Sequence, residues 1–356
     1  MSTHASAPAA PGLGAPRADG CGPWRLTLVT NPDDCNLACS MCECGAARAG
    51  GAARRPHAPR RMDPELALRV LDERRGSALR EVIPSTMGEP LLWAGLDGLV
   101  DLCAERALSL NVTTNGTFPG RGAAAWAARL VPVASDVKIS WNGATAATAA
   151  VVMPGLSLDA AAENVRALVA ARDAHARTAG RRCGVSFQVT VQQANVHELA
   201  DIVRLAASLC VDRVKLNHLQ PRFPGLLPAS LRRSPEAIAC WNAAVRAARA
   251  AADDARLPSG ATVLLQNAIE LAPDPRAPAP LGPCPFVGRE AWIHTDGRFA
   301  PCPHPAAARG ELGELGSVAE TPLGELWASG RFRALVAGYE DHAVCRSCPL
   351  RRPGGA

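Results

Sequence analysis

The apolar and polar positions of this chain follow two different periods, and the two kinds of segment alternate. Short β-branched or apolar runs predict strands at 25–30, 80–84, 109–114, 135–141, 184–191 and 212–217. Apolar residues at helical spacing predict helices near 63–75, 96–107, 121–130, 158–178 and 195–209. The first helix also has a start signal, because Asp63 is an N-cap residue and Pro64 fits the first helical position.

A strand followed by a helix, repeated six times, predicts right-handed crossovers and therefore a parallel sheet. This number is two short of a closed eight-stranded barrel. We therefore expect an α/β fold, a partial (β/α)6 TIM-like barrel that stays open. In such folds the chemistry lies at the C-terminal ends of the strands.

Polar residues and cysteines do follow the ends of the predicted strands. The first strand runs into a cysteine-rich loop, and the other five are followed by 84–90, 113–116, 140–143, 192–195 and 217–220. The pattern indicates that one edge of the sheet carries the functional groups.

The cysteine-rich loop places three thiols, Cys35, Cys39 and Cys42, within eight residues. Three thiolates on a four-iron cluster leave one iron open to another ligand, whereas four thiolates close a site. A zinc loop or plain buried thiols are the alternatives that this spacing leaves open. Cys44 lies two residues beyond the loop, and we leave it out of the ligand set.

The chain changes character after the sixth unit. A Pro/Arg-rich connection, a helix over 235–255 and a strand over 261–266 precede a Pro-rich linker. The last part predicts a hairpin over 291–299 and a helix over 322–337. The expected parts are a disordered tail (1–22), the barrel (23–234), a bridging segment (235–280), a small cysteine-marked domain (281–350) and a second tail (351–356).

A second group of cysteines marks the small domain. Cys284 and Cys302 are followed by the short pair Cys345-x2-Cys348. Four thiolates close a metal site, so this group suits either a structural zinc ion or a fully ligated cluster. Only one of the two pairs has the short spacing typical of zinc sites, which favours the cluster.

Composition narrows the function classes. The net charge is +5, yet the chain has only two lysines, Lys138 and Lys215, and its arginines are scattered among acids, so nucleic-acid binding has little support. No signal peptide and no membrane-spanning apolar run is present. We expect a cytoplasmic protein without a membrane partner, in which 13 cysteines indicate metal or redox chemistry.

The order of the strand-end motifs resembles the radical S-adenosylmethionine (SAM) enzymes across about 24–220. The CxxxCxxC loop is similar to the one whose open iron chelates SAM. The resemblance implies SAM contacts. Gly88, Glu89 and Pro90 match the GGEP motif, with Met87 in place of its first glycine, and Asn115 lies at the third strand end. Ser140 and Asn142 match the ribose-binding strand end, where Asp is common in place of Asn142, and Met41 occupies the position that meets the adenine. No arginine lies in 144–158, where related enzymes often hold the SAM carboxylate.

The small domain resembles the Twitch domain, a shortened relative of the SPASM domain. The resemblance implies a second, fully ligated [4Fe-4S] cluster on Cys284, Cys302, Cys345 and Cys348. Its spacing is similar to that in the cyclitol dehydrogenase of butirosin biosynthesis, and radical SAM epimerases are related. The implied function is abstraction of a hydrogen atom by a 5′-deoxyadenosyl radical from a carbohydrate or aminocyclitol of secondary (antibiotic) metabolism, giving hydroxyl oxidation or epimerisation. A flavodoxin- or ferredoxin-type electron donor is the expected partner.

Two residues are candidates for catalytic roles. His218, at the end of the sixth strand, could take the proton of a substrate hydroxyl, although a histidine that only satisfies backbone groups is the plainer interpretation. Cys240 lies in the first turns of a helix and could return a hydrogen atom in an epimerase. Packing is the likelier role of a lone thiol, and the same holds for Cys21, Cys103, Cys183 and Cys210.

Two other functions stay open. A peptide maturase would use the same machinery on a ribosomal precursor, but the expected tail before the barrel is too short for a leader-recognition domain. A non-catalytic iron–sulfur or zinc protein is the less favoured alternative.

Overall fold

A computed structural model describes residues 22–43, 45, 59–73, 77–84, 87–274, 282–348 and 350–351. Most of the two expected tails (1–22 and 351–356) and of the Pro-rich linker, together with Cys21 and Cys44, lie outside the described residues. The chain divides into two compact units. The first comprises 1–33, 59–111 and 278–356, and the second comprises 34–58 and 112–277.

The first unit is built on parallel strands. Its strands are β1 (Arg25–Leu28), β2 (Glu81–Pro84), the first half of β3 (Ser109–Thr114), β8 (Glu290–Ile293) and β9 (Phe299–Ala300). They follow the order β9-β8-β1-β2-β3, with β8 parallel to β1 and β9 antiparallel to β8. The expected hairpin over 291–299 is therefore present, and its first strand also extends the parallel sheet.

Buried ion pairs hold the start of β1 between its neighbours. Arg25 donates to Glu81 on β2 at 2.8 Å and to Glu290 on β8 at 2.7 Å. Asn111 on β3 adds a bond to Glu81 at 2.7 Å. Because both carboxylates are buried and paired, they fix the register at which β8 joins β1.

Two longer helices and a short turn follow the strands of the first unit. They are α2 (Pro64–Asp72), the 3-10 turn η1 (Pro90–Leu92) and α3 (Leu96–Glu105). Asp63 caps α2 as expected, accepting from the Glu65 N–H at 3.0 Å.

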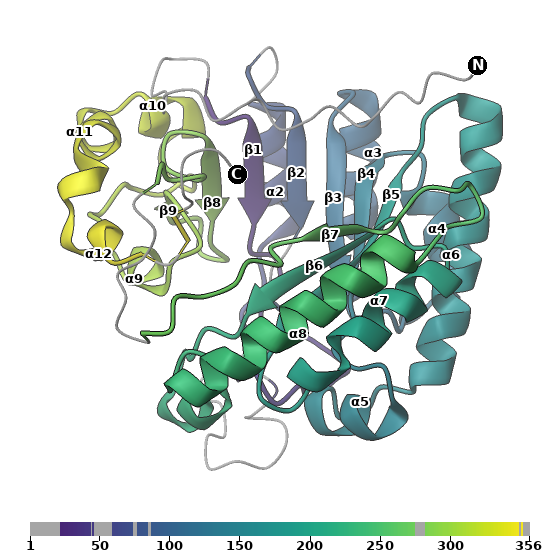
Figure 1. Ribbon diagram of the computed structural model, residues 1–356. Helices are drawn as coiled ribbons and strands as arrows, with labels where there is room; N and C mark the ends of the chain where they lie inside the picture. The colour runs from purple at the N-terminus through teal and green to yellow at the C-terminus, as the bar shows by residue number, and fades with distance from the viewer. Residues whose placement is uncertain are drawn as a thin grey trace. The chain divides into compact units, whose positions relative to one another are not determined.

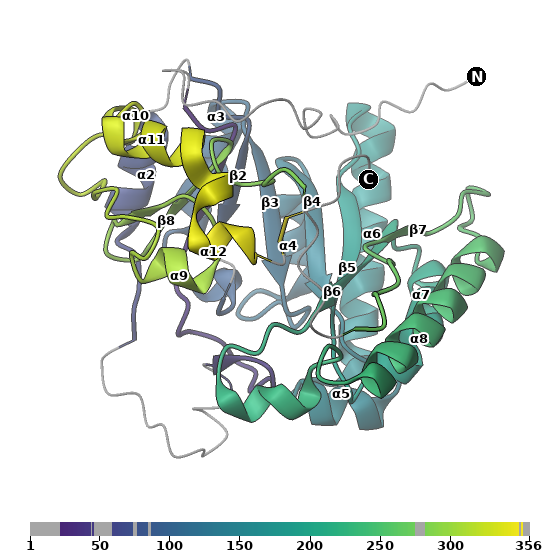
Figure 2. The same ribbon diagram turned by 60° about the vertical axis from the view of Figure 1, so that its left-hand side comes forward.

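The C-terminal part of the first unit consists of short helices. These are α9 (Pro305–Ala308), α10 (Leu323–Trp327), α11 (Gly330–Gly338), η4 (Tyr339–Asp341) and α12 (Ala343–Arg346), drawn in yellow-green to yellow in Figure 2. The single helix expected over 322–337 is two helices, because the Ser329 hydroxyl accepts from the Phe332 N–H and starts α11. Trp327 and Phe332 then pack together with ring centroids 4.5 Å apart.

The second unit contains the remaining strands in the order β4-β5-β6-β7, all parallel (Figure 1). They are β4 (Ala134–Ser140), β5 (Gly184–Val191), β6 (Arg213–His218) and β7 (Leu264–Gln266). The helices are α4 (Gly122–Leu130), α5 (Ala146–Val152), α6 (Leu158–Ala179), α7 (Leu199–Ser208) and α8 (Pro235–Asp254), with 3-10 turns η2 (Val196–Glu198) and η3 (Pro224–Ala229). The helices α7 and α8 pack against each other along their lengths (Figures 1 and 2).

The fold class expected from the sequence is confirmed. The structure is an α/β fold with a parallel sheet whose strand order has free ends at β7 and β9, so the sheet is open, as in a partial barrel. The helix α5 was not expected, because its seven residues are too few to show a clear helical period. Within the described residues, no helix is long and apolar enough to cross a membrane.

Candidate active site and metal centres

The cysteine loop is anchored to the C-terminal end of α5. The Ser40 N–H donates to the Val152 carbonyl at 3.0 Å, and the Ala38 N–H donates to the Pro154 carbonyl at 3.1 Å. Leu37 is 2% exposed and packs on Val152 and Met153, with Met41 against the same cluster. Cys35, Cys39 and Cys42 are all partly exposed. The loop is therefore fixed through its backbone.

Asn115, at the end of β3, contacts the first of these thiols. Its side-chain N–H₂ donates to Cys35 Sγ at 3.6 Å and to Asn36 Oδ1 at 2.8 Å. Asn36 in turn donates to the Thr117 hydroxyl at 2.9 Å. Hydrogen bonds to a metal-ligating sulfur tune the metal. The structure thus places Asn115 against a candidate ligand, and a direct contact to SAM remains a prediction.

Gly88, Glu89 and Pro90 form a rigid turn in the first unit. Gly88 has φ +76°, which favours glycine, and Glu89 is fully buried with its carboxylate accepting from the Leu91 N–H at 3.2 Å. The Glu89 carbonyl accepts from the Asn31 side chain at 2.8 Å. Sequence reasoning missed Asn31, because its partner lies 58 residues away. That Glu89 binds SAM remains a prediction.

Of the two predicted ribose contacts, one is bonded within the protein. Asn142 is 4% exposed, its Oδ1 accepts from the Thr190 N–H at 2.7 Å, and its Nδ2 lies 3.2 Å from Met153 Sδ. Ser140, at the end of β4, is half-buried. The Asn142 oxygen can accept a second bond, so both ribose contacts stay predictions.

Glu198 in η2 is a site residue that the sequence did not reveal. Its buried carboxylate accepts from the Ala144 N–H at 2.6 Å and from the hydroxyls of Thr145 and Thr148, each at 2.7 Å. Burial alone would raise the pKa of this carboxyl, but these hydrogen bonds outweigh it and lower the pKa. Glu198 therefore fixes the N-terminal end of α5, whose other end holds the cysteine loop.

The other four predicted ligands meet in the first unit. Cys284, Cys302, Cys345 and Cys348 line one cavity, together with Tyr339 and Arg351. Three of the four thiols are buried. Within the described residues, no group of His, Cys, Asp and Glu is arranged to hold a single metal ion. A cubane cluster holds its thiolates farther apart than one zinc ion does, so the shared cavity suits a cluster.

The charges of these thiols are coupled. Burial raises the pKa of Cys302 to about 12 and that of Cys345 to about 11, and mutual repulsion among the thiolates adds to both shifts. The N–H groups of Phe286 and Val287 donate to Cys284 Sγ at 3.5 and 3.4 Å. Binding of iron at this cavity therefore has to release the thiol protons. The N–H groups of Phe286 and Val287 are already placed to stabilise a ligated Cys284 sulfur.

His218 and Cys240 differ in their surroundings. The His218 ring lies 4.0 Å from the buried Trp241 ring, and its Nδ1 is buried without a hydrogen-bond partner in the described part of the chain. Burial, with Arg232 nearby, lowers the pKa of His218 to about 4, so its imidazole is neutral at pH 7. Cys240 is exposed on α8. Their catalytic roles remain predictions.

One face of the second unit's sheet is lined with polar residues. Ser140, Gln188, Lys215 and Gln266 are paired in register across β4, β5, β6 and β7, and all are half-buried. Lys138, two residues before Ser140 on β4, shares this face because side chains alternate along a strand. We call these five residues the polar row. It contains both lysines of the chain, and period-two alternation within the strands was the signal that could have found it.

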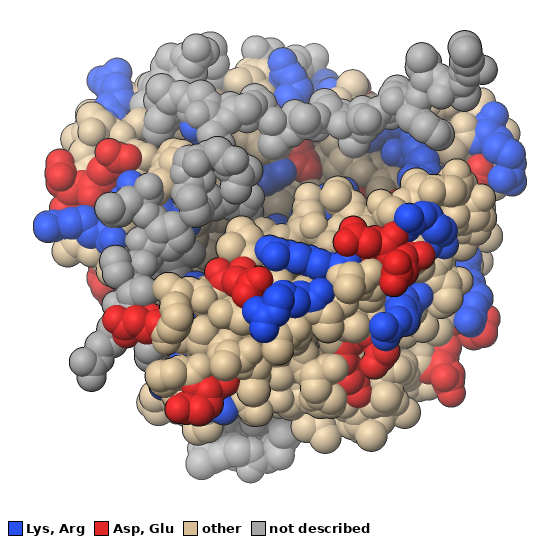
Figure 3. All heavy atoms as spheres, in the orientation of Figure 1, with Lys and Arg blue, Asp and Glu red and all other residues tan. Residues whose placement is uncertain are grey.

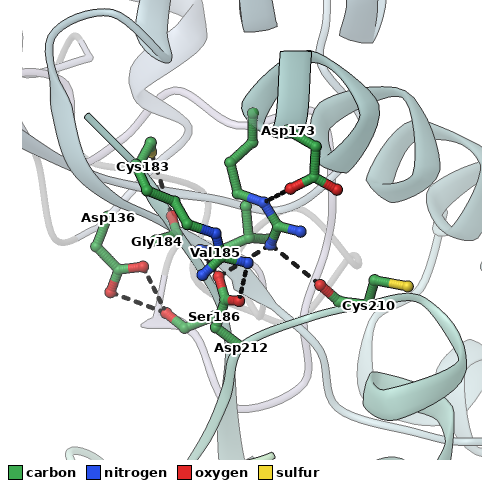
Figure 4. Close-up of polar contacts among 10 residues, drawn as sticks. Asp136, Asp173, Cys183, Gly184, Val185, Ser186, Cys210 and Asp212 are labelled. Carbon is green, nitrogen blue, oxygen red and sulfur yellow. Dashed lines mark hydrogen bonds and ion pairs between the residues drawn. The ribbon is translucent and has the colours of Figure 1, made fainter. Parts of the chain in front are cut away.

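The remaining described cysteines show no site. Figure 4 shows Cys183 and Cys210 beside an ion network in which the buried Arg172 donates to the Cys210 carbonyl at 3.0 Å and to Asp212 at 2.9 Å. Cys183 is fully buried at the start of β5, and burial raises its pKa to about 12. These contacts stabilise the end of the sheet opposite to the polar strand ends.

The fold and the two cysteine groups define the class of protein, an iron–sulfur enzyme on an open α/β sheet. The radical SAM superfamily model matches residues 32–206, and the SPASM model, an iron-sulfur cluster-binding domain, matches residues 284–349. The chain belongs to the radical SAM superfamily and carries a SPASM-type domain. It therefore takes [4Fe-4S] clusters and S-adenosylmethionine as cofactors. No curated protein sequence matches the chain.

Solved structures share the fold at low sequence identity. Streptococcus suis SuiB bound to S-adenosylmethionine has a TM-score of 0.64 and 13% identity, over 92% of this chain and 72% of that one. The enzyme anSMEcpe with bound AdoMet has a TM-score of 0.62 and 14% identity, over 91% of this chain and 88% of that one. BtrN in complex with AdoMet and 2-DOIA reaches a TM-score of 0.45 and 13% identity over 94% of each chain, a likeness too weak to support an inference.

Proposed function

We propose that this radical SAM enzyme oxidises a secondary hydroxyl of a sugar or aminocyclitol to a ketone, in secondary metabolism. The polar row carries the proposal, because half-buried hydroxyl, amide and ammonium groups in register can bind a substrate with many hydroxyls. Asn217 extends this polar face, since its side chain donates to Gln188 Oε1 at 3.4 Å and accepts from Asn267 at the same distance.

We assign the three thiols of the loop to the SAM-binding cluster and the four thiols of the cavity to the auxiliary cluster. Bound SAM supplies the 5′-deoxyadenosyl radical that removes one hydrogen atom from the carbinol carbon. The protein holds the loop through Val152, Pro154 and Asn115, and places the substrate on the polar row. A flavodoxin or ferredoxin is the proposed electron donor.

Oxidation to a ketone then requires that one proton and one electron leave. We propose that the neutral imidazole of His218 accepts the hydroxyl proton. Its low pKa keeps it neutral, as an acceptor must be, and makes it a weak base suited to a hydroxyl that the neighbouring radical has already acidified. The electron has an acceptor in the auxiliary cluster, which is closed by four thiolates and offers no iron to substrate.

Epimerisation is the competing outcome. It returns a hydrogen atom and needs no electron acceptor, so the second cysteine group favours oxidation. Cys240 is the thiol that epimerisation would use, and it is accessible. If substrate carrying deuterium at the carbinol carbon instead yields product with solvent hydrogen there, and Cys240→Ala abolishes this, the enzyme is an epimerase.

A peptide maturase is the second candidate. The structurally similar SuiB has been solved with the precursor peptide SuiA, and anSMEcpe with the Cp18Cys peptide. Neighbouring genes discriminate the two, because sugar or aminoglycoside enzymes support our proposal and a short precursor gene supports peptide modification.

The decisive experiment uses the anaerobically reconstituted enzyme with dithionite, SAM and a panel of aminocyclitols and sugars deuterated at each carbinol carbon. We expect deuterium in 5′-deoxyadenosine and one ketone per molecule of SAM cleaved. The absence of any 5′-deoxyadenosine contradicts the radical chemistry, and its formation without a ketone contradicts the dehydrogenase.

A further inference from the structure

Arg351 forms part of the wall of the four-cysteine cavity. Its side chain is 8% exposed, and its Nε donates to the Gly282 carbonyl. Its backbone N–H donates to the Cys348 carbonyl at 3.3 Å, and its guanidinium lies 5.8 Å from the centroid of the Tyr339 ring. Tyr339 in turn accepts from the Cys284 N–H through its hydroxyl at 3.3 Å. The cation is therefore held at the cavity wall by the Gly282 carbonyl and beside the Tyr339 ring.

The charge of Arg351 is only weakly balanced. Its carboxylate partner, Glu340, lies 3.3 Å from Nη2, but the Glu340 side chain is 62% exposed. Water screens an exposed carboxylate far more than it screens a buried guanidinium. The positive charge consequently acts on the cavity more strongly than the negative one.

This cation lies at the same cavity as the thiols. Arg351 lines it together with Cys284, Cys302, Cys345 and Cys348. Because a buried charge is screened little by water, its field acts on the sulfur atoms that would ligate the cluster.

We propose that Arg351 raises the reduction potential of the auxiliary cluster. Reduction adds one negative charge to the cluster, so a buried cation beside it stabilises the reduced form, and net charge is one of the factors that set cluster potentials. In the sequence this residue falls in an expected tail, and only the fold brings it to the cavity.

The consequence for the reaction rests on the proposed function. Conversion of the alcohol to a ketone would release one hydrogen atom to the SAM-derived radical, one proton to His218 and one electron, which a cluster held by Cys284, Cys302, Cys345 and Cys348 would accept. A cation that stabilises the reduced state makes the last of these transfers more favourable.

The test is a redox titration of the reconstituted full-length protein, in which the signals of the two clusters are followed separately without substrate. We expect Arg351→Gln to lower the reduced-to-oxidised ratio of the auxiliary cluster at a fixed potential at least tenfold, which corresponds to about 59 mV for one electron. Arg351→Lys should retain most of the potential, and the SAM-binding cluster should not shift.

Arg346 supplies the matched control, because it flanks the same cysteine pair on an exposed position. Arg346→Gln should leave the auxiliary potential unchanged. An unchanged potential in a fully loaded Arg351→Gln variant overturns the proposal, and so does an equal shift in Arg346→Gln.

Loss of iron from Arg351→Gln would leave a second variant to decide. Glu340→Gln removes the partial, screened counter-charge and keeps Arg351, so it should raise the auxiliary potential by less than Arg351→Gln lowers it; a decrease overturns the proposal. The redox titration contains no substrate, so its result does not depend on the proposed function. A shifted potential in the titration, combined with no ketone in the activity assay, contradicts the proposed function alone.

Discussion

Ser40 of the cysteine loop donates its backbone N–H to the carbonyl of Val152, the last residue of α5, across 3.0 Å. The other end of α5 is held by the Glu198 carboxylate through Thr145 and Thr148. A seven-residue helix thus connects a buried carboxylate to the loop that carries three candidate cluster ligands. The position of the loop depends on a residue more than 150 positions away in the sequence.

Replacing Glu198 by alanine should loosen the loop. The Ala144 N–H and the hydroxyls of Thr145 and Thr148 lose a charged acceptor, so we expect a loss of about 1–3 kcal/mol in the free energy of unfolding, measured with urea. The SAM-binding cluster should lose iron to a chelator faster, while the auxiliary cluster should not. Asp136→Asn is the control. Asp136 lies in the N-terminal half of β4, and its buried carboxylate accepts from the Ser186 hydroxyl on β5. Equal rates of iron loss in both variants contradict the coupling.

The pH dependence of Glu198 has a defined sign. Its folded-state pKa is lowered, so its contribution is complete above the unfolded value of about 4.3 and is lost as the pH falls through the folded pKa. Glu198→Gln should therefore be less stable than the parent at pH 6, and the difference should shrink toward pH 3. A difference that is constant over this range would show that the ionised form is not what stabilises α5.

Asn115 should influence the cluster through Cys35. Asn115→Ala removes the donor to Cys35 Sγ, and we expect a lower potential for the SAM-binding cluster and faster loss of its iron. Asn164→Ala is matched to it, since Asn164 donates at 2.9 Å to the carbonyl of Gly116 in the same turn without contact to a cysteine. Equal effects of the two variants on the potential would indicate that the turn, not the bond to sulfur, is responsible.

His218 should make the fold sensitive to moderate acid. Its pKa is about 4 in the folded state against about 6.5 unfolded, so between these values only the unfolded chain takes up the proton. Stability should therefore fall as the pH decreases from about 6.5 to 4, by as much as about 3 kcal/mol. His218→Phe keeps an aromatic ring beside Trp241 and should remove this part of the pH profile. An unchanged profile contradicts the buried neutral state.

The same residue separates binding from proton transfer. If His218 accepts the hydroxyl proton, His218→Asn should lower kcat by about 10²–10⁴ with little change in KM. Formation of 5′-deoxyadenosine without product should persist, because hydrogen abstraction precedes proton loss. A variant that produces ketone at the parental rate excludes this role.

Two clusters predict a simple division of the iron. Replacing Cys35, Cys39 and Cys42 together by alanine should remove roughly half of the iron, and replacing Cys345 and Cys348 should remove the other half. Iron analysis with absorption spectra measures this. A complete loss of iron in the first variant contradicts two independent clusters.

Charges of both signs are mixed on the surface face shown in Figure 3. Blue and red spheres are interspersed there, and no large area has one sign. Arg246 of α8, for example, pairs with Glu270 at 2.5 Å, and both side chains are exposed. Exposed pairs of this kind contribute at most about 1 kcal/mol each.

The amino-acid sequence determined the repeated strand–helix order and the cysteine spacing, because both are local patterns. A strand can be recognised from a period-two run such as 184–191, and a helix start from a capping sequence such as Asp63-Pro64, without tertiary structure. The helix α5 could not be predicted in this way, since seven residues are too few to form a stable helix alone and this helix depends on Glu198 from another segment.

What only the tertiary structure decided are the pairings of buried charged and polar groups across long separations. Glu198 with Thr145, Asn115 with Cys35 and Arg25 with Glu290 join residues that no local pattern relates. A buried polar group needs a hydrogen-bond partner, but the sequence around it does not say which residue that partner is. The sequence by itself therefore identified the ligand-bearing loops, and the fold decided which residues hold them.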